Sequence, residues 1–432
     1  MSTIKTFGPV DERSLAQLER CMEAGDAEYG VLCADHHPGY SQPIGGGVAY
    51  EGYVSPSGVG YDIGCGNKAA RTDLSRTDLE TLGGVERVMR EITRRISFGM
   101  GVPAAERVDH PVLDRIRRAD FGPQRKLAQL AESQLGTVGS GNHYVDLMED
   151  GEGRIWVGVH FGSRGFGHKT ASGFLALAQG LPFGSRASEG EMDSPPVLFE
   201  VGSELGEAYV SAMELAGEYA YAGRDVVVDK VLGILGAVAV TEVHNHHNFA
   251  WREEHFGRSY WVIRKGCTPA RPGQEGFVGG SMGDESVILE GVGGEEAEES
   301  LFSTVHGAGR AMSRSQAAGK VRRRKRWVCL DRDCDRVFET AAGCPHHPGA
   351  RLRKVWVEEQ VKLGRVDWPA VQARLREEGI VLLGGGADEA PEAYKRLPDV
   401  LASHAGSVRV KHRLRPLGVA MASRDVQDPY KD

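Results

Sequence analysis

The chain has 432 residues, a length that fits one large domain or two ordinary ones, and its 41% hydrophobic and 26% charged residues are typical of a globular protein. No apolar run approaches the roughly 20 residues that a membrane-spanning helix needs, and the N-terminal stretch MSTIKTFGPVDERS has no apolar signal-peptide core. The net charge of -8 gives no general attraction to nucleic acid, so such binding would require a local basic patch. We therefore expect a cytoplasmic protein with no membrane partner.

The predicted elements mix helices with short strands that end in glycine turns. Residues 12–25 have the apolar spacing of a helix that stops at a glycine, and residues 74–134 are predicted to be mainly helical. The apolar runs at 154–162 and 260–266 predict buried strands, and residues 203–235 predict a long helical hairpin. The 58 glycines are too many for a mainly helical protein. The sequence thus predicts an α+β fold with functional groups on loops between strands.

Five segments place a histidine, cysteine or aspartate at a glycine-rich strand end: GVGYDIGCGNK, GTVGSGNHYVD, GVHFGSRGFGHK, TEVHNHHNFAWREEH and STVHGAGR. Each segment alone is also compatible with a tight turn around a buried cysteine or a structural histidine. The repetition favours a metal site with an additional reactive histidine. From the residues alone, both interpretations stay open.

Two further loops have the composition of anion-binding sites. Arg164 lies among glycines, and a planar cation beside exposed N–H groups suits a phosphate. The stretch GFVGGSMGDES can wrap a nucleotide with its backbone amides, although an ordinary surface loop is the alternative.

Eight motifs, GVGYDIGCG, GSGNH, HFGSRGFGH, HNFAWREEH, RKGCT, GGSMG, STVHGAGR and EAPEAYK, occur in this order and resemble those of the RtcB family of RNA ligases. The resemblance runs from about residue 12 to residue 421, apart from an insertion at 319–355. It implies GTP- and manganese-dependent joining of RNA that ends in a 2′,3′-cyclic phosphate or 3′-phosphate to RNA that begins with a 5′-hydroxyl. It also implies a mixed α/β domain, residues 1–318 and 356–432, with β-sheets around a deep cleft that holds two Mn²⁺ ions.

The resemblance also implies roles for individual residues. Asp62, Cys65 and His143 match the ligands of one metal ion; Cys65, His160 and His247 match those of the other, with the Cys65 thiolate bridging. His306 matches the nucleophile that forms a covalent bond to GMP. Arg164 is our candidate for the RNA phosphate. The implied nucleotide contacts are Asn142, Asp146, Asn248, Gly279, Gly280, Ser281, Met282, Ser286, Gly307, Ala308, Gly309 and Tyr394.

Three positions depart from the family pattern and indicate a divergent paralogue. Met421 stands where the family has a lysine that contacts the nucleotide, Asp146 replaces a glutamate and Gly279 replaces a proline. A thioether cannot replace a cation beside a polyphosphate. Either Lys411, Arg424 or another basic group substitutes, or guanylylation is weakened or altered.

The insertion at 319–355 is basic and rich in cysteine and histidine. Cys329 and Cys334, followed by Cys344 and His347, resemble the two ligand pairs of a zinc ribbon, with His346 as a competing ligand. A reduced, metal-free loop is the alternative. The preceding RRRKR run, 322–326, is either a solvated loop or an arm that contacts the RNA backbone.

The sequence leaves three functions to compare. The first is RNA ligation in RNA repair or tRNA processing, with an archease-type protein as a possible activator. The second is a nucleotidyl transfer that processes 3′-phosphate ends without sealing. The third is a metal-containing protein that binds RNA ends and has lost GTP chemistry.

Overall fold

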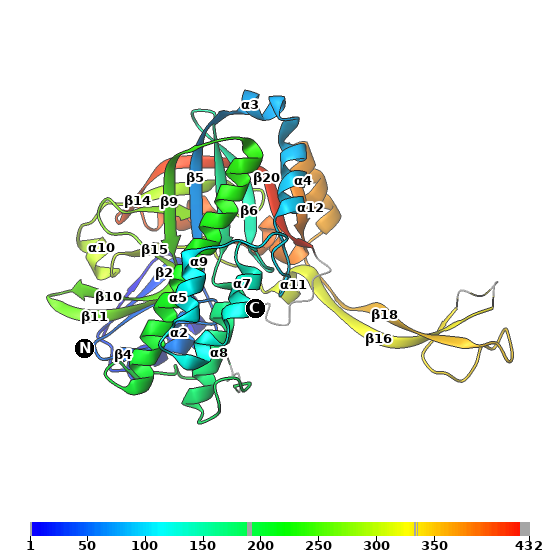
Figure 1. Ribbon diagram of the computed structural model, residues 1–432, viewed down its shortest axis with the longest axis horizontal. Helices are drawn as coiled ribbons and strands as arrows, with labels where there is room; N and C mark the ends of the chain where they lie inside the picture. The colour runs from blue at the N-terminus through cyan, green and yellow to red at the C-terminus, as the bar shows by residue number, and fades with distance from the viewer. Residues whose placement is uncertain (1, 188–191, 332–333, 335, 424–432) are drawn as a thin grey trace.

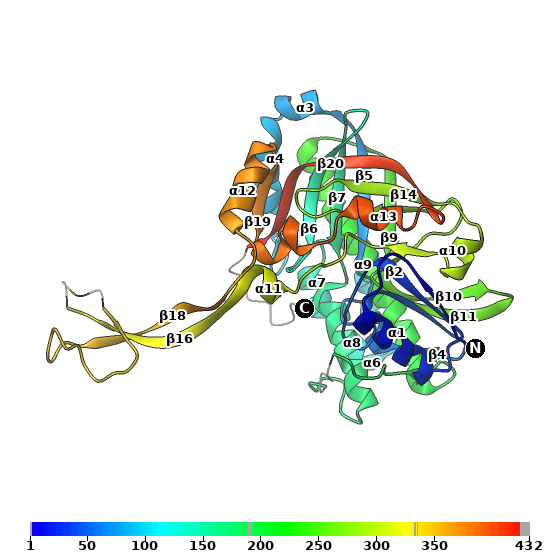
Figure 2. The same cartoon turned by 180° about the vertical axis from the view of Figure 1, so that it is seen from behind.

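A computed structural model describes residues 2–187, 192–331, 334 and 336–423. It has a mixed α/β body from which a long two-stranded arm projects, as Figure 1 and the reverse view in Figure 2 both show. The predicted mixed α/β class is confirmed. No helix in the described part of the chain is both long and apolar enough to cross a membrane.

Two sheets form the body. The smaller has the order β1 (Thr3–Thr6), β2 (Tyr29–His37), β3 (Ile44–Tyr50), β11 (Arg258–Lys265) and β10 (Asn248–His255). The larger has the order β13 (Glu275–Val278), β14 (Ser286–Gly291), β20 (Val408–Ser423), β6 (Tyr144–Asp150), β7 (Arg154–Phe161), β5 (Gly66–Ser75) and β9 (Ala239–His246), with β19 (Val381–Gly385) parallel to β20. Two short pairs complete the body: β4 (Tyr53–Val54) with β8 (Phe199–Glu200), and β12 (Cys267–Pro269) with β15 (Ser303–Val305).

Helices cover these sheets. They are α1 (Glu12–Ala24), α2 (Pro56–Val59), α3 (Arg76–Thr81), α4 (Gly84–Arg95), α5 (Pro111–Arg117), α6 (Gly122–Arg125), α7 (Ala128–Gln134), α8 (Arg164–Ala178), α9 (Glu204–Leu235), α10 (Glu295–Glu299), α11 (Arg314–Ala318), α12 (Trp368–Glu377) and α13 (Leu397–Ala402), with 3-10 turns Ala387–Glu389 and Pro391–Ala393. One core lies between α1, α8, α9 and the smaller sheet, and a second lies between α4, α9 and the larger sheet. The long helix α9 therefore joins the two halves of the body.

Most of the predicted elements are confirmed. The helix at 12–25 is α1, which ends just before Gly25, and the strands at 154–162 and 260–266 are β7 and β11. The region 74–134 is mainly helical as predicted, divided into α3 to α7. Gly83 and Gly84 separate α3 from α4 because both adopt a positive φ, 93° and 84°.

The predicted helical hairpin at 203–235 is wrong, because the segment forms one continuous helix of 32 residues, α9. Gly217 does not break it. A Cβ at this position would lie 2.6 Å from the ring of Phe249, so close packing of β10 on the helix requires glycine there. The helix ends where Gly236 adopts the left-handed conformation with φ 64°.

The arm consists of β16 (Gly319–Cys329), β17 (Val337–Phe338) and β18 (Leu352–Leu363) in the order β17-β16-β18. The predicted insertion at 319–355 lies within it, and β18 continues to Leu363 before α12 returns the chain to the body. A small cluster of buried cysteines with Phe338, Ala350 and Leu352 packs at its far end.

Candidate functional site

The ends of four neighbouring strands bring the candidate metal ligands together. Cys65 precedes β5, His143 precedes β6, His160 is near the end of β7, and His247 lies between β9 and β10. The register pairs Gly66 with both the end of β7 and the end of β9, and it pairs the first residue of β6 with His160. Antiparallel pairing thus places residues from distant parts of the chain at one sheet edge.

The distances within this group are those of metal ligands. The Cys65 Sγ lies 3.4 Å from His160 Nε2 and 3.7 Å from His143 Nε2, and the ligand atoms of these three residues are all within 4.8 Å of one another. Asp62 joins the group through an oxygen 3.2 Å from His143 Nε2. The His247 ring centroid is 5.2 Å from that of His160, which places it at the side of the group.

Burial sets the protonation of these side chains. It raises the pKa of the Cys65 thiol well above its usual value, and the Asp62 carboxylate adds to that effect. It also lowers the pKa of His160 and of His247 well below the usual value, so both imidazoles are neutral and can act as ligands. Burial alone would raise the pKa of Asp62, but hydrogen bonding and the charge of His143 hold it below its usual value.

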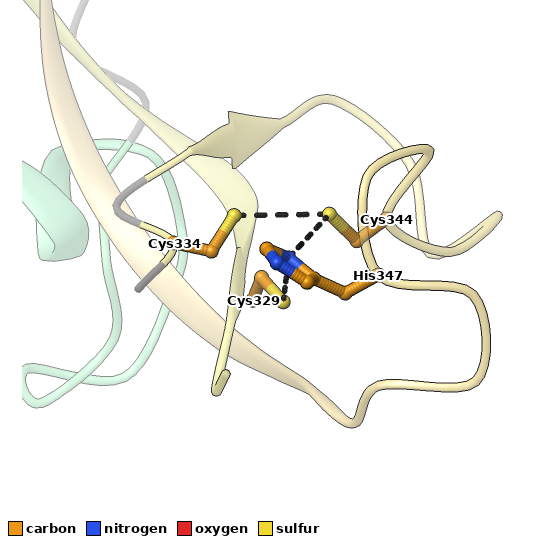
Figure 3. A group of neighbouring side chains, drawn as sticks. All are labelled: Cys329, Cys334, Cys344 and His347. Carbon is orange, nitrogen blue, oxygen red and sulfur yellow. Dashed lines mark hydrogen bonds between the residues drawn. The ribbon is translucent and has the colours of Figure 1, made fainter. Parts of the chain in front are cut away.

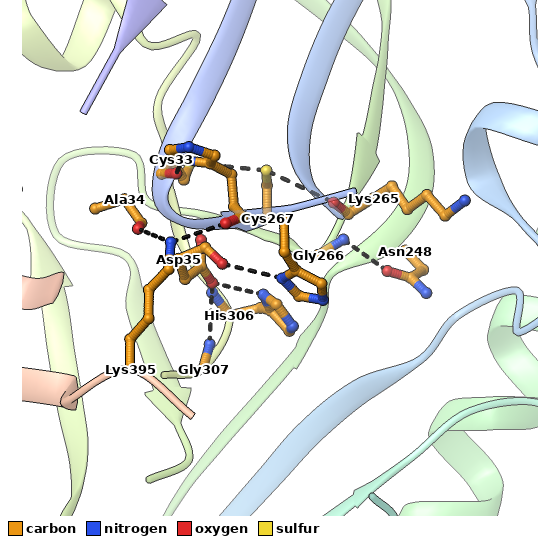
Figure 4. A network of polar contacts seen from close by, with 12 residues as sticks. Cys33, Ala34, Asp35, Asn248, Lys265, Gly266, Cys267, His306, Gly307 and Lys395 are labelled. Carbon is orange, nitrogen blue, oxygen red and sulfur yellow. Dashed lines mark hydrogen bonds and ion pairs between the residues drawn. The ribbon is translucent and has the colours of Figure 1, made fainter. Parts of the chain in front are cut away.

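His306 follows β15, and its ring centroid is 4.9 Å from that of His247. A buried carboxylate on β2, Asp35, fixes this imidazole: Asp35 Oδ2 lies 2.6 Å from His306 Nδ1 and accepts the backbone N–H of His306 at 2.9 Å (Figure 4). Burial opposes ionisation of Asp35, but the charge and hydrogen bonds of His306 lower the pKa of this carboxyl overall. With Nδ1 engaged, Nε2 is the imidazole nitrogen left for chemistry.

Asp35 was not predicted as a site residue from the sequence. A signal was present, since an acidic residue inside the apolar run VLCAD is expected to be buried only with a partner. Its partner is 271 residues away, and no local pattern identifies it.

His306 lies on the wall of a pocket beside the metal-ligand group. Eleven residues of the sequence-predicted site line this pocket in addition to His160: Asn142, Asp146, Gly279, Gly280, Ser281, Met282, His306, Gly307, Ala308, Gly309 and Tyr394. Two predicted nucleotide contacts, Asn248 and Ser286, are outside the lining and bind backbone N–H groups instead. Asn248 accepts the Gly266 N–H at 2.7 Å, and Ser286 Oγ accepts the Gly280 N–H at 3.0 Å.

Asp146 is the buried carboxyl of this pocket. Its Oδ1 atom has no hydrogen-bond partner among the described residues, and burial raises the pKa of the carboxyl well above its usual value. A buried polar atom without a partner is costly, so a ligand that supplies a hydrogen-bonding group here would be favoured.

Met421 lines the pocket. Lys411, also on β20, is not among the residues that line the pocket and pairs with Glu275. Arg424 lies outside the described residues. Arg310 and Arg314, which the sequence analysis did not single out, both line the pocket.

Arg164 begins α8 with a positive φ of 54°, and its Nη1 atom is 3.1 Å from His143 Nδ1. It also packs on Gly139, where a Cβ would lie 1.6 Å from Nη2. The guanidinium therefore lies directly behind a candidate metal ligand, and its predicted contact with an RNA phosphate stays a prediction.

The two histidines that precede His247 support the site from behind. His246 Nδ1 is 2.9 Å from the Gly64 carbonyl oxygen and 2.9 Å from Arg224 Nη2. His244 Nε2 accepts a hydrogen bond from Arg224 Nε at 2.8 Å. Arg224, fully buried on α9, thus ties the end of β9, which directly precedes His247, to the turn that carries Cys65.

The second group of candidate ligands lies at the end of the arm (Figure 3). The ligand atoms of Cys329, Cys334, Cys344 and His347 are all within 4.8 Å of one another. The Cys334–Cys344 Sγ distance and the Cys344 Sγ–His347 Nδ1 distance are both 3.7 Å. The competing ligand His346 points elsewhere, with its Nε2 atom 2.6 Å from Arg336 Nη1.

A family model described as "tRNA-splicing ligase RtcB" matches residues 17–121 and 114–337. "RNA-splicing ligase RtcB" of Escherichia coli is 29% identical over 414 residues, covering 89% of this chain and 88% of that protein. The "tRNA-splicing ligase RtcB" of Thermococcus kodakarensis is 29% identical with 95% and 91% covered, and that of Archaeoglobus fulgidus is 31% identical with 90% and 87% covered. Since the family model matches well over half of the chain and these relatives align along nearly all of it, the chain belongs to the RtcB family.

Proposed function

We propose that this chain is an RNA ligase that joins a 2′,3′-cyclic phosphate or 3′-phosphate end to a 5′-hydroxyl end with GTP and two Mn²⁺ ions. The names of its relatives support RNA ligation. The observation that carries the proposal is the position of His306: its Nδ1 is held by buried Asp35, and it lies between the metal-ligand group and a glycine-lined pocket.

The ligand set fits divalent metal ions. Asp62 supplies a carboxylate, Cys65 a thiolate, and the neighbouring imidazoles are neutral because burial lowers the pKa of His160 and His247. The 3.2 to 3.7 Å separations among Asp62, Cys65 and the two nearest imidazoles are the edges expected around ions with bonds of about 2.0–2.3 Å. When bound, such ions neutralise phosphate oxygens and orient the reacting groups.

In the proposed reaction, the His306 Nε2 lone pair attacks the α-phosphorus of GTP. An N–P bond forms, the bond between the α-phosphorus and the bridging oxygen breaks, and pyrophosphate leaves. The RNA 3′-phosphate then takes GMP from His306, and the 5′-hydroxyl oxygen attacks the activated phosphate and expels GMP. Asp35 stabilises the positive charge that develops on the imidazole, as the buried carboxylate does in other histidine-based sites.

The pocket offers the groups that this reaction needs around the nucleotide. The turns 279–280 and 307–309 line the pocket mainly with glycine, so a nucleotide can approach their main chain closely. Arg310 and Arg314 supply the positive charge that Met421 cannot. Their partners, Glu389 and the Tyr394 hydroxyl, hold both guanidiniums on the pocket wall.

We also propose that the arm holds one zinc ion in a closed site and that it is a separate module inserted into the catalytic domain. Tetrahedral zinc with Zn–S bonds of about 2.3 Å places neighbouring ligand atoms about 3.6–3.8 Å apart. The 3.7 to 3.9 Å separations among Cys329, Cys334, Cys344 and His347 fit this arrangement. The role in RNA repair or tRNA processing, the archease-type activator and the cytoplasmic location stay predictions.

A joining assay tests the proposed function. The purified chain is incubated with GTP, Mn²⁺ and two RNAs, one with a 3′-phosphate and one with a 5′-hydroxyl, beside His306→Ala as the matched inactive control. We expect a joined product with the parent chain and none with the variant. Conversion of the 3′-phosphate end to a guanylylated end without joining would favour the end-processing alternative. RNA binding without any GTP-dependent product would favour the RNA-end-binding alternative.

A further inference from the structure

The arm begins and ends beside the candidate nucleotide pocket. Arg314, which lines the pocket, starts α11, and α11 leads directly into β16 at Gly319. On the return side, β18 ends at Leu363, and Trp368 then packs in the hydrophobic cluster that contains the pocket residue Met421. Figure 1 and Figure 2 show the arm extending outward from this place. A polymer that enters the pocket from the arm side would therefore meet the arm first.

One face of the arm carries alternating lysine and tryptophan side chains. The register of β16 and β18 pairs Lys325 with Trp356 and Trp327 with Lys354. Because side chains two apart on a strand point to the same side, these four residues share one face, which we call the Lys/Trp face. Trp356 is 59% exposed, and the Lys325 Nζ atom is 5.4 Å from its ring centroid. Both lysines are exposed, and neither has a carboxylate within ion-pair distance among the described residues.

The opposite face of the same strands has a different character. Arg324 Nε lies 3.1 Å from Glu359, and Arg326 pairs with Glu359 and, at 3.3 Å, with Glu339. Val357 stands opposite Arg324 in the register. Arg324 and Arg326 of this face are thus paired with carboxylates within the arm, whereas Lys325 of the Lys/Trp face lies over an exposed indole ring.

We propose that the Lys/Trp face binds single-stranded RNA and delivers its end to the pocket. The exposed indole of Trp356, with the half-buried indole of Trp327 beside it, offers a surface on which unpaired bases stack, and the two lysines can contact the phosphates between these bases. Duplex RNA has its bases stacked inside the helix and cannot use the indoles in this way. The identity of the strand as substrate rests on the proposed ligase function, whereas the binding itself does not.

The position of the face sets the length of strand that can use it. Lys325 lies six positions after Gly319 on β16, and at about 3.3 Å per residue the face begins about 20 Å from the root of the arm. An RNA of only a few nucleotides bound in the pocket cannot reach it. The face therefore adds affinity for longer single strands and none for the nucleotide alone.

A pair of matched double variants of the full chain tests this proposal. Lys325→Ala with Trp356→Ala removes one cation and one apolar side chain from a cross-strand pair of the Lys/Trp face. Arg324→Ala with Val357→Ala does the same on the opposite face. The probe is a fluorescein-labelled single-stranded RNA of about 15 nucleotides with a 3′-phosphate, measured by anisotropy, with a duplex of equal length as competitor.

We expect the first variant to raise the Kd for the single strand about tenfold or more and the second to change it less than about twofold. The duplex should compete poorly. The single variant Trp356→Tyr keeps an aromatic surface at this position, so its Kd for the single strand should lie within about threefold of the Kd of the parent. If the first double variant loses bound zinc, Trp356→Leu replaces it in the same assay with the same expected direction.

The proposal would be overturned if both double variants lost affinity for the single strand equally, or if the first variant lost none. Competition by the duplex equal to that of the single strand would also overturn it. The anisotropy measurement contains no GTP and measures no joining, which separates this test from the proposed function. If the parent binds RNA through the Lys/Trp face but does not join it, only the proposed ligase function is refuted. Normal ligation with unchanged binding in the first double variant would refute only the Lys/Trp face.

Discussion

The body and the arm each hold a group of cysteine and histidine side chains, and the surroundings of the two groups differ. In the body, Cys65 and His160 are 95 positions apart, the ends of a large sheet bring them together, and a pocket opens beside them. In the arm, the ligands Cys329 to His347 come from one short segment, and the hydrophobic residues that pack around them in the described part of the arm are Phe338, Ala350 and Leu352. A group that a large core positions can keep an open side for chemistry, whereas a group on a thin ribbon needs its ion to hold the ribbon together.

The largest expected effect comes from exchanging one thiol in each group. Cys65→Ser should lower RNA joining at least about 10³-fold, because it removes the proposed bridging thiolate of the metal site. Cys329→Ser should release one zinc per chain and leave GTP-dependent labelling of His306 within about twofold, since the arm does not touch the pocket chemistry. Elemental analysis and labelling with GTP on both variants check this. Absence of zinc from the parent chain would contradict the arm assignment.

Asp35→Asn should have the next largest effect. It removes the negative charge that lies 2.6 Å from His306 Nδ1 while keeping the shape of the side chain, so the rate of GMP transfer to His306 should fall about 10²-fold. Asp109→Asn, an exposed aspartate, is the control and should be unchanged. Single-turnover labelling gives the rate. A normal rate in Asp35→Asn would remove the carboxylate from the mechanism.

Metal affinity should depend on pH through Cys65. Because burial raises the pKa of this thiol, it keeps its proton near neutral pH, and a metal ion that binds the thiolate must displace that proton. The Mn²⁺ affinity should therefore rise with pH, with a contribution of about tenfold per pH unit from Cys65. Cys65→Ser retains its hydroxyl proton, so its slope should be about one unit smaller. Titrations between pH 6 and 8 with equal slopes for both proteins would contradict a thiolate ligand.

The smallest effect is expected at Met421. A lysine here would place a cation at the pocket wall, and one such group beside a polyphosphate should lower the KM for GTP about fivefold. Met421→Leu keeps an apolar side chain of similar size and should leave the KM within about twofold of the parent. Steady-state kinetics distinguish the two. A higher KM in Met421→Lys would indicate that Arg310 and Arg314 already occupy the space around the phosphates.

The sequence predicts local features of this fold better than distant ones. The helix α1 and the strands β7 and β11 follow from periodicity and from glycine stops, which are local signals. The single helix α9 does not follow from such signals. Its Gly217 marks no turn and is required because Phe249 packs closely on the helix at this point. Only the tertiary structure distinguishes a glycine that ends a helix from one that admits a neighbour.

The candidate site shows the same limit. The pattern of histidine and cysteine at glycine turns pointed to residues that the structure brings together around Cys65, but Asp35 was missed because its partner is far away in sequence. The sequence favoured His347 as the fourth ligand, with the adjacent His346 as a competitor. The fold separates them by turning one toward Cys344 and the other toward Arg336.

The most direct test of the central claim is mass spectrometry of the chain after incubation with GTP and Mn²⁺ in the absence of RNA. The account predicts a single added GMP on the peptide that contains His306, acid-labile as an N–P bond is, and absent from His306→Ala. GMP on another residue, or no GMP on a parent chain that still joins RNA, would contradict it.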